Sequence, residues 1–150
     1  LFYSGLFYAC GLASVYVSGQ SSDRTGDRKW HCVGGQVVTA LFLAGSAIPG
    51  QSFPLVMTWL CLTGLAAYFW PSPFWALPTI FLSGPAAAAS IALINATGNL
   101  GGFAGPYMIG YLADVTGGYT AGILYLVVCG LAGSALILSL RVARTDVETP

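Results

Sequence analysis

The sequence predicts an all-α integral membrane protein with five transmembrane helices. The first observation is composition, because hydrophobic residues make up 56% of the 150 residues and charged residues only 7%, against about 25% charged residues in typical soluble domains. The second is the segregation of charge, because no Asp, Glu, Lys or Arg occurs in residues 30–113 or 115–140. Since a helix needs about 20 apolar residues to cross a bilayer, the longer range can hold three spans and the shorter range one.

The first predicted span covers residues 1–18 and is followed by a charged stretch, residues 19–31. This stretch carries half of the charged residues of the chain, namely Asp23, Arg24, Asp27, Arg28 and Lys29. Because Lys and Arg gather in cytoplasmic loops, we interpret residues 19–31 as a cytoplasmic loop. Gly19 can end the first helix in a left-handed conformation, and Gly26 allows a sharp turn.

The second and third predicted spans cover residues 32–48 and 53–82, with a turn at Pro49 and Gly50 between them. Prolines remove backbone donors and bend helices. The third span is therefore expected to be interrupted at its three prolines, Pro71, Pro73 and Pro78. A further break is expected at residues 83–85, where Ser, Gly and Pro follow one another.

The fourth and fifth predicted spans cover residues 86–112 and 120–140, with a turn at Gly117 and Gly118 between them. Arg141 and Arg144 follow in a polar tail, which the same charge rule places in the cytoplasm. An even number of spans must then separate the charged loop from the tail, and the four predicted spans satisfy this condition. Because every backbone group must be paired within lipid, each span is expected to be helical.

Several classes of function are not expected from this composition. The formal net charge is zero, so nucleic acid is not an expected partner. The four cysteines lack any metal-type spacing, and we interpret them as small buried hydrophobes rather than as disulfides or ligands. The predicted spans hold no acid, no histidine cluster and no Ser/His pair. We therefore expect neither an enzyme nor a metal or cofactor site.

The charged loop follows the pattern Gly-x-x-x-Asp-Arg-x-Gly-x-Arg-Lys. Its fixed positions are Gly19, Asp23, Arg24, Gly26, Arg28 and Lys29. An acidic side chain here can cap the positive N-terminus of a neighbouring helix, while the basic residues hold it and anchor the loop, so we assign the pattern a gating role. The alternative is an ordinary positively charged loop. His31, at the end of the loop, is interpreted as an interfacial residue rather than a proton relay.

Four residues are candidates for contacts with a substrate. Asn95 and Asn99 are four residues apart and share one helix face. The alternative for both is hydrogen bonding to neighbouring helices, which a stripe of small residues on the same helix would allow to approach closely. Ser72 and Trp75 lie in the proline-interrupted region, and broken membrane helices often line a cavity. The alternative for Trp75 is packing.

These segments together resemble a known family. The loop pattern is similar to the signature of the major facilitator superfamily, which joins helices 2 and 3 and recurs between helices 8 and 9. Residues 22–31, 74–79 and 92–110 are similar to the anion:cation symporter family within it, which includes tartrate-, phthalate- and sugar-acid-type permeases. Because the chain also opens inside an apolar segment, the resemblance implies the C-terminal portion, helices 8–12, of a twelve-helix fold.

The resemblance implies proton-coupled uptake of a small organic anion by alternating access across the inner membrane of the cell. Trp75 on helix 10 and Asn95 on helix 11 would line the substrate cavity. The proton-coupling acids and the arginine for the substrate carboxylate would lie in the N-terminal half, so the expected partners are the anion, the proton, the bilayer and that half. The alternative function is a membrane-embedded structural or assembly subunit.

Overall fold

The computed structural model describes residues 2–140, and within that range the chain is helical and has no strand. This confirms the all-α class. The helices in chain order are α1 (Phe2–Thr25), α2 (Arg28–Ser46), α3 (Phe53–Ala67), α4 (Pro71–Ala76), α5 (Pro78–Phe81), α6 (Gly84–Thr116) and α7 (Thr120–Ser139).

Two of the predicted spans pass a test of length and hydropathy for crossing a bilayer. They are Phe53–Phe81, which runs through α3, α4 and α5, and Thr120–Ser139, which is α7. In each of them, only 17% of the most apolar 18-residue segment is buried inside the chain. These segments therefore differ from the core helices of soluble proteins, which are mostly buried. The membrane class is thereby supported, and the other three spans remain predictions.

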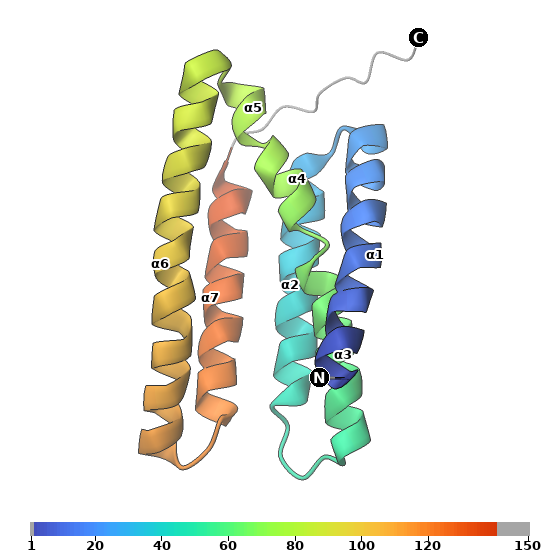
Figure 1. The fold of residues 1–150 in the computed structure, drawn as a ribbon, viewed down its shortest axis with the longest axis vertical. Coiled ribbons are helices and arrows are strands. Elements are labelled where there is room, and N and C mark those ends of the chain that lie inside the picture. The colour runs from blue at the N-terminus through green and yellow to red at the C-terminus, as the bar shows by residue number, and fades with distance from the viewer. Residues whose placement is uncertain (1, 141–150) are drawn as a thin grey trace.

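The packing places α2 at the centre, between α7 on one side and α3 on the other. Helix α1 packs on α3 and α4, whereas α6 packs on α7 and α5. The α1–α2 turn, the α5–α6 junction and the end of α7 lie at one end of the bundle, which we call the charged end (Figure 1). This placement agrees with the even number of spans expected between the charged turn and the tail, which stays a prediction. Arg141 and Arg144 lie outside the described residues.

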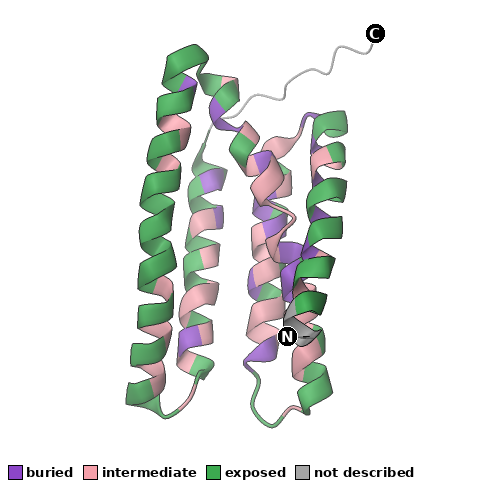
Figure 2. Cartoon of the chain, in the orientation of Figure 1, coloured by how far each residue is buried: buried purple, intermediate pink, exposed green. Residues whose placement is uncertain are grey.

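The buried core is small and lies near the charged end. Its centre is formed by Cys32 and Val33 of α2, Leu77 between α4 and α5, and Ile137 of α7. Helix α6 is exposed along most of its length (Figure 2), and among its residues only Ala87 is buried. The chain therefore presents one long helix with little cover from its own residues.

The predicted loop at residues 19–31 is much shorter than expected. Helix α1 continues to Thr25, and only Gly26 and Asp27 separate it from α2. Gly26 has a φ of 65°, which confirms the sharp turn there. Gly19 lies inside α1 without a positive φ, so the prediction that it ends the helix is wrong. Polar residues alone do not stop a helix, because its end requires a backbone change such as the one at Gly26.

The third predicted span is divided at two of its three prolines, whereas the interruption expected at Pro73 is absent because Pro73 lies inside α4. Pro71 and Pro78 stand at the first positions of α4 and α5, where a missing amide is tolerated. Helix α6 starts at Gly84 and continues through Pro106 to Thr116, so it is longer than the predicted range 86–112. Gly117, with a φ of 73°, ends it and confirms the turn.

Candidate functional site

The α1–α2 turn is held by a helix cap that the sequence analysis did not single out. Asp27 is the N-cap of α2, and its Oδ1 accepts a hydrogen bond from the Trp30 backbone N–H at 3.4 Å. Such a cap satisfies one of the amide donors that a helix start leaves unpaired. The signal was present, because an Asp directly before a helix start is a typical N-cap.

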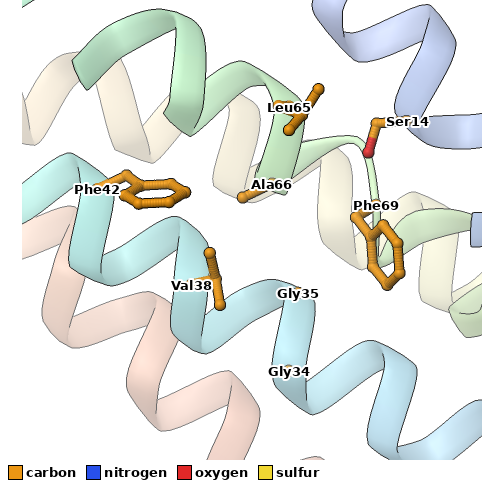
Figure 3. Close-up of a pocket in the computed structure, with 8 residues that line it drawn as sticks. All are labelled: Ser14, Gly34, Gly35, Val38, Phe42, Leu65, Ala66 and Phe69. Atoms are coloured by element: carbon orange, nitrogen blue, oxygen red, sulfur yellow. The ribbon is translucent and has the colours of Figure 1, made fainter. Parts of the chain in front are cut away.

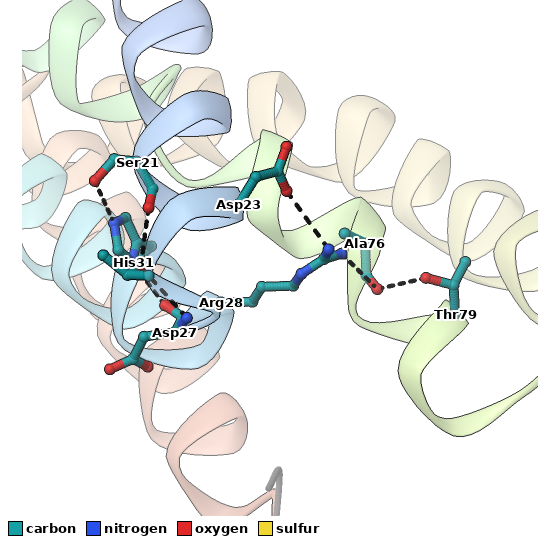
Figure 4. A network of polar contacts seen from close by, with 8 residues as sticks. Ser21, Asp23, Asp27, Arg28, His31, Ala76 and Thr79 are labelled. Carbon is teal, nitrogen blue, oxygen red and sulfur yellow. Dashed lines mark hydrogen bonds and ion pairs between the residues drawn. The ribbon is translucent and has the colours of Figure 1, made fainter. Parts of the chain in front are cut away.

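Arg28 connects the charged turn to the proline-interrupted region. Its Nη2 lies 3.5 Å from Asp23 Oδ1, and its Nη1 donates to the Ala76 carbonyl at 3.4 Å (Figure 4). Thr79 Oγ1 donates to the same carbonyl at 2.8 Å. The Asp23 side chain is 72% exposed and the Arg28 side chain 25% exposed. Arg28 thus joins the start of α2 to the last residue of α4.

Lys29 connects the same turn to the end of α7. Its Nζ donates to the Leu138 carbonyl at 2.8 Å and to the Leu140 carbonyl at 2.6 Å. The last carbonyls of a helix have no intrahelical donor, and a Lys is well suited to satisfy them. Arg24, by contrast, is exposed and makes no ion pair or side-chain hydrogen bond within residues 2–140.

His31 forms a bridge between α1 and α2. Its Nε2 lies 2.9 Å from Ser21 Oγ, and its Nδ1 donates to the Asp27 carbonyl at 2.6 Å. The imidazole also stacks on the Phe69 ring, with ring centroids 5.9 Å apart. Both ring nitrogens are engaged in local contacts, so the geometry favours a structural role for this histidine.

A second set of contacts joins α1 and α2 to the start of α4. The Ser18 hydroxyl donates to the Phe69 carbonyl, and Cys32 Sγ lies 3.7 Å from the Trp70 carbonyl oxygen. A Cβ at Gly19 would lie 3.1 Å from Ser72 Oγ. The glycine of the loop pattern therefore gives α4 room to approach α1, which explains its position in mid-helix.

The predicted substrate residues lie on two helices that the structure does not bring together in one pocket. Trp75 of α4 is 39% exposed and contacts the Phe74 ring edge-on. Asn95 and Asn99 of α6 are both exposed, and their side chains make no hydrogen bond within the described residues. Their alternative role, bonding to neighbouring helices, is not seen in this part of the chain. Ser72 lies beside Gly19, as described above.

The face of α6 that carries the asparagines is open. Its small-residue stripe consists of Gly98, Gly101, Gly102 and Gly105, and a Cβ added at any of these glycines would meet nothing within 4 Å. Within the described chain, no other helix therefore lies within 4 Å of the space that a side chain at these glycines would occupy. Amide side chains on an open helix face can donate and accept hydrogen bonds with a bound polar molecule.

A cavity of about 240 Å³ lies between α1, α2 and α3 (Figure 3). Its lining is apolar except for one hydroxyl, and consists of Ser14, Gly34, Gly35, Val38, Phe42, Leu65, Ala66 and Phe69. None of the predicted substrate residues belongs to it. Because it contains no cation, this cavity alone cannot neutralise an anion.

Comparison with known proteins finds relatives among membrane transporters. The chain is 47% identical over 125 residues to a protein from Agrobacterium vitis named "Putative tartrate transporter". The matched residues make up 83% of the chain and 27% of that protein. It is 36% identical to the "Quinolone resistance transporter" of Acinetobacter baumannii, over 99% of the chain and 34% of that protein. It is 30% identical to the "Inner membrane transport protein RhmT" of Escherichia coli K12, over 95% of the chain and 33% of that protein.

The chain thus spans about a third or less of the length of these curated relatives. No family model and no solved structure gives a significant match. The relatives are named as transporters, and none of these names is that of an enzyme. The alternative of a structural or assembly subunit is not favoured.

Proposed function

Because the chain belongs to the major facilitator superfamily of membrane transporters, we propose that it supplies the C-terminal third of a secondary transporter for a small organic anion. The observation that carries this proposal is the 47% identity to a protein named as a tartrate transporter over 83% of the chain. In this proposal the five helical segments are helices 8–12 of a twelve-helix fold. The most specific assignment is the anion:cation symporter family.

The proposed mechanism is proton-coupled alternating access across the inner membrane, with the charged end of the bundle and the tail in the cytoplasm. No charged residue occurs in residues 30–113, so the charge of the anion and the coupled proton must be handled by the N-terminal half. The chain described here contributes uncharged contacts. A buried ion requires a partner of opposite charge, which supports this division of roles.

Asn95, Asn99 and Trp75 are the proposed substrate contacts. The two asparagines are exposed and have no hydrogen-bond partner within the described residues, so their amides are available to a ligand. Trp75 is partly exposed on α4. Ser72 is also a candidate from the sequence, but a Cβ at Gly19 would lie 3.1 Å from its hydroxyl oxygen, and this close approach of α1 favours packing.

The test is uptake of radiolabelled tartrate by the full-length transporter in proteoliposomes with an imposed proton gradient. Replacement Asn95→Ala is expected to lower uptake roughly tenfold, because a hydrogen bond to a charged group contributes about 1.5–3 kcal/mol. Thr97→Val is the matched control, since the Thr97 hydroxyl bonds carbonyls of its own helix at 2.9 and 3.0 Å.

Equal uptake by the Asn95→Ala and Thr97→Val proteins would contradict the role of Asn95. Uptake of tartrate that does not respond to the proton gradient would contradict proton coupling. Absence of tartrate uptake by the wild-type protein, together with uptake of another organic acid, would correct the substrate and retain the class.

A further inference from the structure

In the region from Phe69 to Leu82, the carbonyls of Phe69 and Ala76 lack the backbone amide donor that a continuous helix would supply. In an α-helix each carbonyl accepts from the amide four residues ahead. The residue four ahead of Phe69 is Pro73, which has no amide hydrogen. The amide four residues ahead of Ala76 belongs to Ile80, and it donates to the Leu77 carbonyl instead, at 3.1 Å. An unpaired carbonyl is costly where water is scarce.

Donors from α1 and α2 take the place of these amides. At the start of α4 the fully buried Ser18 donates its hydroxyl to the Phe69 carbonyl. At the end of α4 Arg28 Nη1 donates to the Ala76 carbonyl at 3.4 Å, beside the Thr79 hydroxyl. The two donors thus act on a carbonyl two residues before α4 and on the carbonyl of its last residue.

Two features keep these donors in place. Gly19 leaves room for the Ser72 hydroxyl, where a Cβ would come within 3.1 Å, so α1 and α4 can approach closely next to Ser18. Asp23 pairs with Arg28 Nη2 at 3.5 Å, which orients the guanidinium group so that its other nitrogen reaches Ala76 (Figure 4). A guanidinium has a planar, fork-like set of donors suited to two acceptors at once.

We propose that Ser18 and Arg28 are positioning residues that clamp α4 onto the α1–α2 hairpin through these two carbonyls. Held at these two carbonyls, α4 then moves as one body with the hairpin. The clamp itself follows from the contacts of this chain. Its use when the charged end opens during transport rests on the proposed function.

The test is amide hydrogen exchange of the full-length transporter, measured peptide by peptide. In Arg28→Gln, peptides covering residues 69–82 are expected to exchange at least about fivefold faster, because loss of a carbonyl partner makes local opening easier. Peptides from α6 should not change. Arg24→Gln is the matched control, since it removes the same charge from a neighbouring residue that has no partner within residues 2–140.

A second pair of variants tests the other end of the clamp. Ser18→Ala is expected to accelerate exchange in the same peptides, whereas Thr39→Val is expected not to, because the Thr39 hydroxyl bonds the Gly35 carbonyl within an uninterrupted helix at 2.7 Å. If Ser18→Ala does not accumulate in the membrane, the Arg28 comparison decides alone. Equal exchange in Arg28→Gln and Arg24→Gln would overturn the clamp.

Transport kinetics separate positioning from a purely structural role. In Arg28→Gln the maximal rate of tartrate uptake should fall while KM stays unchanged, and Arg28→Lys should restore part of the rate, because lysine keeps a charged donor. A change in KM alone would contradict the assignment. If the wild-type protein does not move tartrate, the proposed substrate fails, while the exchange comparison still decides the clamp.

Discussion

Two adjacent glycines of α2 have opposite surroundings. A Cβ at Gly35 would lie 2.9 Å from Trp70 Cβ and 3.1 Å from the Trp70 backbone nitrogen, whereas a Cβ at Gly34 would meet nothing within 4 Å. Gly35 is therefore required by the close approach of α2 to the start of α4. Gly34 is not required by any such contact in the described chain.

This contrast predicts opposite effects of the same substitution. Gly35→Ala is expected to destabilise the full-length protein by about 1–3 kcal/mol, because the backbone at Trp70 cannot yield easily. Gly34→Ala is expected to be neutral or to stabilise by up to about 1 kcal/mol, since alanine is the better helix former. Thermal unfolding in detergent measures both, and a lower Tm for Gly34→Ala than for Gly35→Ala would refute this explanation.

The cap at Asp27 gives a second prediction at the residue scale. Asp27→Ala removes the acceptor for the Trp30 amide and is expected to cost about 0.5–2 kcal/mol, whereas Asp27→Asn retains an acceptor and should cost less. The same thermal measurement compares them. Equal losses in both variants would show that the charge of Asp27, rather than its capping bond, matters.

At the scale of the helices, Lys29 links the first turn of α2 to the last turn of α7. Lys29→Ala leaves the Leu138 and Leu140 carbonyls without this donor. We expect severalfold faster amide exchange in the last turn of α7, because helix ends fray when their final carbonyls lose partners. Arg24→Ala is the control, and similar exchange in both variants would argue against the link.

The sequence predicted which elements exist better than where they end. Prolines and glycines identified the breaks at Pro71, Pro78 and Gly117, because their backbone effects are local. The loop predicted at residues 19–31 from its charged residues is wrong in extent, because α1 continues to Thr25. A polar residue shows that a segment leaves the apolar environment, and does not by itself show that its helix ends.

The candidate site was predicted only in part. Arg28 was identified by its place in a pattern, but its contact with Ala76 joins residues 48 positions apart. Ser18 gave no signal at all, because a serine in an apolar helix has many uses and its partner lies 51 residues away. Contacts of this kind depend on how the helices pack, which spacing along one segment does not reveal.

At the scale of the whole molecule, the division of charge predicts that residues 1–150 alone do not transport. Residues 32–113 carry no Asp, Glu, Lys, Arg or His, so the spans predicted within them have none of the side chains that commonly carry a proton or balance an anion within the bilayer. Proteoliposomes containing only this chain should take up no more tartrate than empty liposomes. Uptake comparable with that of the full-length protein would disprove the proposed division of roles between the two halves.

The contacts of Lys29 also impose an order on assembly. Its two acceptors lie 109 and 111 residues further along the chain, so they emerge from the ribosome long after α2 has been made. Until α7 arrives, the ammonium group must remain with water or lipid headgroups, where a lysine is readily accommodated. Lys29 thus binds the end of α7 only after the rest of the bundle has been made, and this late contact joins the first turn of α2 to the last turn of α7.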